Sequence, residues 1–304
     1  MGYLTRWLGP AAIAFSLFLA GVVLVWAESY NKGQPVWPAY EGWEKNADGS
    51  FNLVFGYMND NWEEQLDLPV GPGNNIEPGG PDQGQPTHFL PRRNRFMFRI
   101  RVPKDFGSQE VVWTLIANKK TTKAYASLRP DLVIENVDIM SETGALGAGT
   151  SSPEIRANKP PFVKLEGEKT RGAKVGQPVE LVAIVTDDGV PKARKISAQT
   201  ARNSAFRPLQ RITVTKVLGL HLSWFVYRGR GGVSFEPSQI KVWEDTRAGA
   251  NSPWAPVWVL PPVPADGRYV TEVKFDEPGT YVLCARADDG GLTTDEMLTF
   301  NVTQ

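Results

Sequence analysis

Four aspartates in two turns are the side chains of this sequence best suited to chemistry, because Ca²⁺ binds six to eight oxygen ligands and carboxylates supply them. Each turn has two aspartates followed by a glycine and comes directly after a strand-like run. If both turns lie at the same end of one sandwich, their carboxylates converge on a cation. The alternative is that each aspartate only caps its own turn, as Asp-Gly sequences commonly do. The four residues are Asp187, Asp188, Asp288 and Asp289.

A long basic segment, residues 190–219, follows the first acidic turn. It contains no acidic residue, although the whole chain balances 33 Lys and Arg against 33 Asp and Glu. A loop of this length is either solvated and without a partner or functional. The functional reading is an arm that docks on an acidic protein surface or on anionic lipid headgroups. Its basic residues are Lys192, Arg194, Lys195, Arg202, Arg207, Arg211 and Lys216.

Residues for catalysis are scarce in this chain. It has two histidines, His88 and His221, which lie far apart in the sequence, and one cysteine, Cys284. A catalytic triad, a histidine metal site or a CxxC pair is therefore not indicated, and we expect no enzyme and no small-molecule substrate. Tryptophans offer a carbohydrate-binding face as an alternative function, although in β-sandwiches they more often belong to the core. They are Trp62, Trp113, Trp243, Trp254 and Trp258.

The N-terminal region contains an uncharged apolar segment, residues 7–27. About 20 such residues in a helix span the hydrocarbon core of a bilayer. Trp7 and Trp26 bracket the segment, as an aromatic belt at the two interfaces would. Arg6 precedes it, so the positive-inside rule places residues 1–6 in the cytoplasm and the rest of the chain in the periplasm. Cleavage after Ala27, which would release a secreted form, is the competing interpretation.

Small residues at every fourth position of this expected helix, Ala12, Ser16 and Ala20, form a stripe of the kind through which spanning helices associate. Residues 28–43 follow and are rich in aromatic residues and proline. We interpret them as a stiff neck near the lipid headgroups, with Tyr30 and Trp37 as further interfacial aromatics.

The rest of the chain predicts an all-β fold with two antiparallel sandwiches. Strand-like runs occur at 51–57, 95–102, 110–117 and 121–126, which we assign to a first sandwich at 44–135. In the second of these runs the alternation places Phe96, Phe98, Ile100 and Val102 on one face. A small-residue stretch at 136–160 predicts a linker, and turn-separated runs after it predict a second sandwich at 161–304.

The second sandwich resembles the immunoglobulin-like modules of the fibronectin and cadherin type. The resemblance depends on Gly176-Gln177-Pro178 before a strand and on Glu277-Pro278-Gly279 before another. It implies that Trp224 is the core tryptophan of the third strand and Tyr281 the tyrosine at the start of the sixth. Cys284 lies near the sixth-strand cysteine position but has no partner for a disulfide. The first half, with its run from Gly84 to Arg93, resembles a module of uncharacterised secreted bacterial proteins.

These features together predict a non-catalytic, single-pass protein of the inner membrane that stabilises a larger membrane complex from the periplasmic side. The layout is similar to that of the single-helix extrinsic subunits of bacterial photosynthetic reaction-centre and light-harvesting assemblies, and respiratory complexes fit as well. Expected partners are integral membrane subunits and the lipid bilayer, not nucleic acid. The alternative is a membrane-tethered module that binds carbohydrate or calcium, and no other cofactor is expected.

Overall fold

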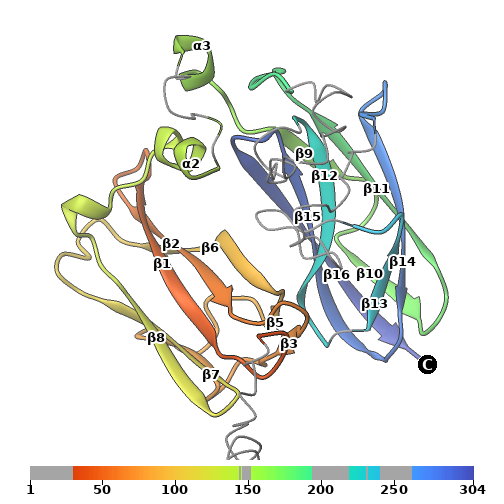
Figure 1. Cartoon of the computed structure of the whole chain (residues 1–304), viewed down its shortest axis with the longest axis horizontal. Helices are drawn as coiled ribbons and strands as arrows, with labels where there is room; N and C mark the ends of the chain where they lie inside the picture. Colours follow the sequence, from red (N-terminus) through yellow and green to blue (C-terminus); the bar gives the residue numbers. More distant parts are fainter. Residues whose placement is uncertain (1–29, 144, 146–151, 194–218, 231, 240–261) are drawn as a thin grey trace, which may run out of the picture. The chain divides into compact units, whose positions relative to one another are not determined.

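The first β-sandwich consists of two three-stranded antiparallel sheets, in the strand orders β1-β2-β6 and β4-β7-β8, with a short β3-β5 pair beside them (Figure 1). The computed structural model describes residues 30–143, 145, 152–193, 219–230, 232–239 and 262–304. The strands are β1 (Val36–Lys45), β2 (Phe51–Asn59), β3 (Leu66–Asp67), β4 (Asn74–Glu77), β5 (His88–Phe89), β6 (Arg92–Val102), β7 (Val111–Ala117) and β8 (Lys120–Ala126).

Aromatic rings fill the space between these two sheets. Trp113 of β7 is fully buried and meets Phe55 and Phe98 edge-on, with ring centroids 6.0 and 5.0 Å apart. Phe55 and Phe98 stack on each other at 5.2 Å. Such edge-to-face and offset contacts are the favoured geometries of aromatic pairs. All four expected strand runs of this half are confirmed, as parts of β2, β6, β7 and β8.

The expected neck at 28–43 is wrong from Val36 onward, because these residues form β1. Val36 and Pro38 are buried, whereas Trp37 between them is exposed, as in a half-buried strand. Pro38 is compatible with this position because β1 lies at the edge of its sheet, where a missing backbone N–H costs no ladder bond. The first sandwich therefore begins before residue 44.

A bulge in β6 changes the predicted alternation. The β2–β6 register shifts by two residues between Phe55 and Tyr57, and Phe96 has a φ of 51°. The prediction that Phe96 shares a face with Phe98 is therefore wrong, since the extra residues of the bulge turn Phe96 to the other side of the strand. Phe98 belongs to the central apolar cluster, whereas Phe96 packs with Val54 in a separate one.

The segment expected to be a linker, 136–160, contains helical structure that packs on both sandwiches. Ile139 and Met140 are buried in the same small cluster as Phe96 from the first sandwich and Leu292 from the second. The linker interpretation is therefore wrong for this part of the segment, because these apolar side chains occur among small residues at helical spacing. Its helices are α2 (Asn136–Thr143) and α3 (Pro153–Arg156), and the short 3-10 helix η1 (Pro130–Leu132) precedes it.

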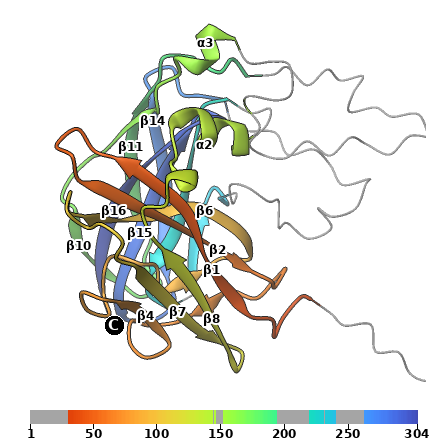
Figure 2. The ribbon, with the colours of Figure 1, turned by 90° about the vertical axis from the view of Figure 1, so that its left-hand side faces the viewer.

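The second sandwich has two four-stranded sheets, in the orders β10-β16-β15-β12 and β13-β14-β11-β9 (Figures 1 and 2). The β10 strand runs parallel to β16 and the other pairs are antiparallel. Apart from β10, this is the immunoglobulin order, with strands A, B, E and D opposite C, F and G. The strands are β9 (Phe162–Leu165), β10 (Thr170–Lys174), β11 (Val179–Thr186), β12 (His221–Arg228), β13 (Val233–Glu236), β14 (Arg268–Phe275), β15 (Gly279–Asp288) and β16 (Thr293–Thr303).

Trp224 and Tyr281 occupy the positions that the immunoglobulin resemblance implies. Trp224 of β12 is buried in the core of the second sandwich. The Tyr281 hydroxyl donates a hydrogen bond to the Glu277 carbonyl oxygen at 2.8 Å, which is the tyrosine corner of these folds. The core residue two positions after this tyrosine is Leu283, not Cys284. Because side chains alternate along a strand, Cys284 lies on the opposite face of β15, in the cluster of the first sandwich.

Within the described ranges no helix has the length and apolar character to cross a membrane. The segment expected to span, residues 7–27, lies outside those ranges, as do its flanking residues up to 29.

Candidate functional site

The joint between the two sandwiches is the most elaborate polar and apolar arrangement among the described residues. Its apolar part is the outward face of β12 and β15. Tyr227 and Cys284 are buried there in one cluster with Met97 and Phe98 of β6. Apolar side chains of one sandwich thus complete the core of the other. An interface of this kind opposes the relative motion that is the default for neighbouring domains.

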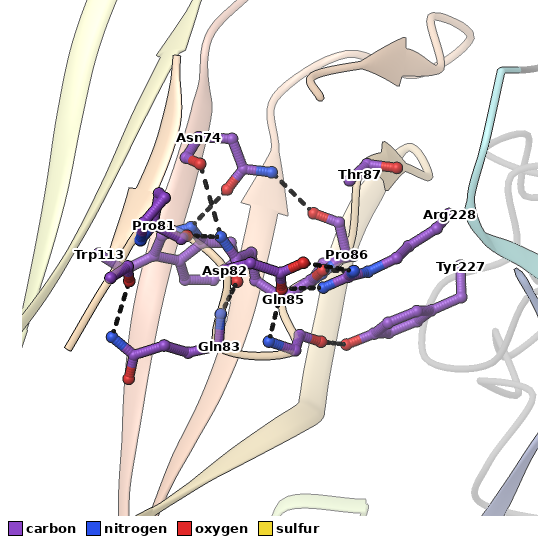
Figure 3. A network of polar contacts seen from close by, with 12 residues as sticks. Asn74, Pro81, Asp82, Gln83, Gln85, Pro86, Thr87, Trp113, Tyr227 and Arg228 are labelled. Atoms are coloured by element: carbon purple, nitrogen blue, oxygen red, sulfur yellow. Dashed lines mark hydrogen bonds and ion pairs between the residues drawn. The ribbon is translucent and has the colours of Figure 1, made fainter. Parts of the chain in front are cut away.

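A polar clasp borders this apolar contact, formed by the loop between β4 and β5 and the end of β12 (Figure 3). The Tyr227 hydroxyl donates to the Gly84 carbonyl oxygen at 2.5 Å. The Arg228 Nε donates to the Gln85 carbonyl oxygen at 2.9 Å. The remaining guanidinium nitrogens bind both carboxylate oxygens of Asp82 at 2.7 and 3.0 Å. Hydrogen bonding from Arg228 lowers the pKa of Asp82 below its ordinary value.

Backbone groups close the clasp on its inner side. The Thr87 N–H donates to the Tyr227 carbonyl oxygen at 3.1 Å, and the Gly229 N–H donates to the Thr87 hydroxyl at 3.1 Å. The second bond holds the end of β12 beside this loop. Six hydrogen bonds therefore join residues 82–87 of the first sandwich to residues 227–229 of the second.

Two buried amides hold the loop in the shape that the clasp requires. Gln85 is fully buried; its Nε2 donates to the Pro81 carbonyl oxygen at 2.6 Å, and its Oε1 accepts from the Gln83 N–H at 2.8 Å. Asn74, also fully buried, donates to the Pro86 carbonyl oxygen at 2.8 Å and accepts from the Trp113 indole at 2.9 Å. Because buried amides are costly when unpaired, this network specifies one loop conformation and links it to the core.

A buried arginine lies beside the apolar contact. Arg286 of β15 binds Asp295 of β16 through two hydrogen bonds of 2.7 Å. Its guanidinium also lies 5.4 Å from the Phe225 ring centroid and 3.8 Å from the Met97 sulfur. The side chain of Arg286 is 3% exposed, so its two-armed pairing with a carboxylate satisfies a charge that would otherwise be unpaired in the joint.

The segment 136–160, which contains α2 and α3 and is here called the connector, makes a second attachment, to the β15–β16 turn. The Thr143 hydroxyl donates to the Gly291 carbonyl oxygen at 3.2 Å, and the Asn158 amide donates to Asp289 Oδ2 at 3.0 Å. The other oxygen of Asp289 accepts from the N–H groups of Gly291 and Leu292 at 2.6 and 2.7 Å. Burial raises the pKa of Asp289 to about 7.

The structure does not gather the four aspartates of the predicted calcium site. No group of three or more His, Cys, Asp or Glu side chains suited to a metal ion occurs among the residues the structure describes. Asp187, Asp188 and Asp288 each accept a hydrogen bond from a backbone N–H two residues later, at 2.8, 3.0 and 2.6 Å. Asp289 makes the bonds given above. All four therefore cap their own turns, and Asp289 in addition binds the distant Asn158.

The predicted docking loop is described only at its two ends, residues 190–193 and 219. Lys192 is exposed and lies 3.8 Å from Glu154 of α3. The other basic residues of that loop lie outside the described ranges, as do the helix stripe and two of the interfacial aromatics. These residues are Arg194, Lys195, Arg202, Arg207, Arg211, Lys216, Ala12, Ser16, Ala20, Trp7 and Trp26.

The aromatic residues of the sequence analysis have separate roles. Trp113 is in the core of the first sandwich, so it cannot contribute to an exposed carbohydrate-binding face. The Arg92 guanidinium carbon lies over the Trp62 ring, 4.4 Å from the ring centroid. Tyr30 and Trp37 are exposed, by 51% and 38%. Trp243, Trp254 and Trp258 lie outside the described ranges.

Both histidines are buried at strand positions. His88 of β5 contacts Asp67 Oδ1 at 2.7 Å and Gln65 Oε1 at 2.9 Å through its two ring nitrogens. His221 begins β12, and its Nδ1 lies 3.0 Å from the Gly219 carbonyl oxygen. Each histidine thus supports the conformation of its own sandwich.

Sequence reasoning did not identify the clasp. Asp82 lies in a segment rich in glycine and proline, which predicts a loop but not its partner. Arg228 begins the run Arg228-Gly229-Arg230, which indicates only a turn. The available signal was the pair of amides Gln83 and Gln85 within that loop, since amides among prolines often bind backbone groups.

Comparisons with known proteins do not assign the chain to a family, so its fold class rests on the strand order described above. No protein-family model and no curated protein matches the chain. Among solved structures, fibronectin(III)-like modules of Clostridium thermocellum CbhA are 11% identical, with 89% of this chain and 95% of that chain covered at a TM-score of 0.24. The D00-D0 domain of Intimin is 10% identical, with 88% of this chain and 99% of that chain covered at a TM-score of 0.23. The SrpA adhesin of Streptococcus sanguinis is 15% identical, with 47% of this chain and 57% of that chain covered at a TM-score of 0.22.

Proposed function

We propose that this protein is a non-catalytic, membrane-anchored scaffolding subunit that stabilises a larger membrane protein complex from the extracytoplasmic side. The observation that carries the proposal is the joint, in which an apolar cluster, the clasp and the connector all bind one sandwich to the other. Three attachments of different chemistry hold the sandwiches at one spacing. A rigid pair of modules can contact a partner at several places without losing conformational freedom on binding.

The sequence supplies the remaining contacts of this proposal. The stripe Ala12, Ser16 and Ala20 would pack against a neighbouring spanning helix, and Trp7, Trp26, Tyr30 and Trp37 would lie at the interfaces. The basic loop at 190–219 would bind an acidic patch of an extracytoplasmic partner. A photosynthetic reaction-centre and light-harvesting assembly or a respiratory complex has the required spanning helices and exposed surface.

The alternative of a tethered calcium- or carbohydrate-binding module has less support. Its four aspartates are occupied with their own turns, and one of its tryptophans is part of a core. We therefore retain the scaffold as the proposed function.

Affinity purification of the full chain from membranes in mild detergent, followed by native electrophoresis, tests the proposal. We expect migration with multi-span proteins. The variant Ser16→Leu, which fills the small-residue stripe, should lose these partners, whereas Leu17→Val, off the stripe, should retain them. Migration of the wild-type chain alone, with both sandwiches folded, would contradict the scaffold.

A further inference from the structure

Gly33 and Gln34, just before β1, are hydrogen-bonded to side chains of the first sandwich. The Gly33 N–H donates to Glu64 Oε2 and the Gln34 N–H to Asn61 Oδ1, both at 2.7 Å. The Asn118 amide, at the tip of the β7–β8 hairpin, donates to the Gln34 carbonyl oxygen at 2.7 Å. The hairpin tip therefore lies directly beside the point where the chain enters the sandwich.

The tip turns its cations outward. Asn118 and Lys119 both have positive φ, 47° and 65°, as a two-residue type I′ hairpin turn requires. Lys119, Lys120 and Lys123 are exposed, and the chain from 111 to 129 contains no acidic residue. This hairpin is thus a local excess of positive charge in a chain whose net charge is zero.

An aromatic side chain accompanies these lysines. The Lys120 ammonium lies 4.2 Å from the centroid of the Trp37 ring, and the Trp37 indole donates to Asp60 at 2.7 Å. Three acidic residues lie at the same end and also accept hydrogen bonds: Asp60 from the Trp37 indole, Glu63 from the Asn31 amide and Glu64 from the Gly33 N–H. Tryptophan and lysine side by side are typical of membrane–water interfaces.

The length of the tether limits how far this end can lie from a bilayer. The expected span ends at residue 27, and the fastened chain begins at Asn31. Four extended residues reach at most about 14 Å. We propose that the β7–β8 hairpin tip, with Lys119, Lys120 and Trp37, contacts the phosphate groups of anionic phospholipids at the outer surface of the membrane. The inference rests on the membrane anchor of the proposed function and assigns the bilayer as the partner of this surface.

A labelling experiment on the full chain tests this contact. The chain has one cysteine, Cys284, which is fully buried, so a fluorophore can be directed to Thr121→Cys beside the tip or to Ala157→Cys after α3. Figures 1 and 2 show α3 at the opposite end of the described part from the β7–β8 tip. The labelled chains are reconstituted into phosphatidylcholine vesicles with and without phosphatidylglycerol, and a headgroup-attached nitroxide quenches fluorophores at the surface.

We expect quenching of the label at 121 but not at 157, and more quenching with phosphatidylglycerol. Each lysine near an anionic surface contributes about 1 kcal/mol, about five-fold in the contact equilibrium. The double variant Lys119→Glu, Lys120→Glu should therefore lower the phosphatidylglycerol-dependent contact by at least about 20-fold. The control Lys164→Glu, Lys274→Glu makes the same charge change on exposed residues of the second sandwich and should have no effect.

The outcomes separate the inference from the anchor. A chain that does not float with vesicles overturns both. A chain that floats, with equal quenching at 121 and 157, overturns the contact and leaves the anchor standing. Quenching of the label at 121 that does not depend on phosphatidylglycerol and persists in the double variant overturns the role of the lysines. Protection of the label in native membranes but not in lipid vesicles would assign the tip to a protein partner instead.

Discussion

Arg228 and Asp82 belong to different sandwiches and pair through two parallel hydrogen bonds, 2.7 and 3.0 Å long. The two residues are 146 positions apart in the chain. The same guanidinium also donates through Nε to a backbone carbonyl of the loop. This relationship makes Arg228 the residue whose replacement most directly reports on the joint.

Arg228→Ala should lower the free energy of unfolding by about 1–2 kcal/mol, because it removes a two-armed ion pair and one hydrogen bond to the backbone. Equilibrium denaturation measures this. The matched control is Arg268→Ala, whose looser ion pair with Glu166, at 3.3 Å, lies within one sandwich; such exposed pairs contribute little to stability. Equal effects of both replacements would refute a special role of the clasp.

Tyr281→Phe should destabilise the second sandwich by about 1 kcal/mol, since it removes the hydroxyl of the tyrosine corner and leaves the Glu277 carbonyl oxygen without that donor. Tyr269→Phe is the control, because the Tyr269 hydroxyl is buried with no hydrogen-bond partner among the described residues. Its removal should be neutral or stabilising. Thermal unfolding compares the two, and the reverse order would count against the tyrosine corner.

Stability should increase as the pH falls from about 7 towards 4. The pKa of Asp289 is raised from 3.8 to about 7 in the folded protein, so the folded state binds a proton that the unfolded state releases. This contribution is fully present below the unfolded pKa and is lost as the pH rises through the folded one. One such group gives a slope of at most about 1.4 kcal/mol per pH unit.

Asp289→Asn should remove this pH dependence and stabilise the protein above pH 7, because the amide oxygen can still accept from the Gly291 and Leu292 N–H groups. The new amide nitrogen cannot accept from Asn158 and instead donates to the Asn158 oxygen, which has no hydrogen-bond partner among the described residues. Asp188→Asn, in an exposed turn of the same kind, serves as the control and should leave the slope unchanged. Denaturation curves measured across this pH range decide the matter. A slope that persists in Asp289→Asn would assign it to another group, such as Glu41, whose pKa is also raised by burial.

Cys284 should not react with thiol reagents while the protein is folded. It is fully buried in the joint, and burial raises the pKa of its thiol well above the ordinary value, so little of the reactive thiolate forms. A chromogenic disulfide reagent should modify it only in denaturant. Rapid modification under native conditions would mean that the sandwiches separate readily.

The sequence by itself indicated the longer strands of this protein but not β3, β4, β5 or the helix α2. Apolar runs identified β2, β6, β7 and β8 and the presence of a second sandwich, because the two-residue period of a strand is visible in local sequence. The immunoglobulin-type positions of Trp224 and Tyr281 were also recognisable, since both depend on neighbouring turns. The sequence missed β1, because its aromatic and proline content resembled a neck rather than an edge strand.

Only the tertiary structure decided which surfaces meet. The partner of Arg228 is a loop aspartate far away in the chain, and nothing in either local sequence encodes that distance. Likewise, Cys284 directly follows the core residue Leu283 on β15. Because neighbouring side chains of a strand point to opposite faces, Cys284 lies in the joint rather than in the core of its own sandwich. The four aspartates met the composition of a calcium site, but each accepts a backbone N–H of its own turn, and the described residues contain no group of three or more side chains suited to a metal ion. Long-range pairing depends on the packing of whole sheets, which local residue patterns do not specify.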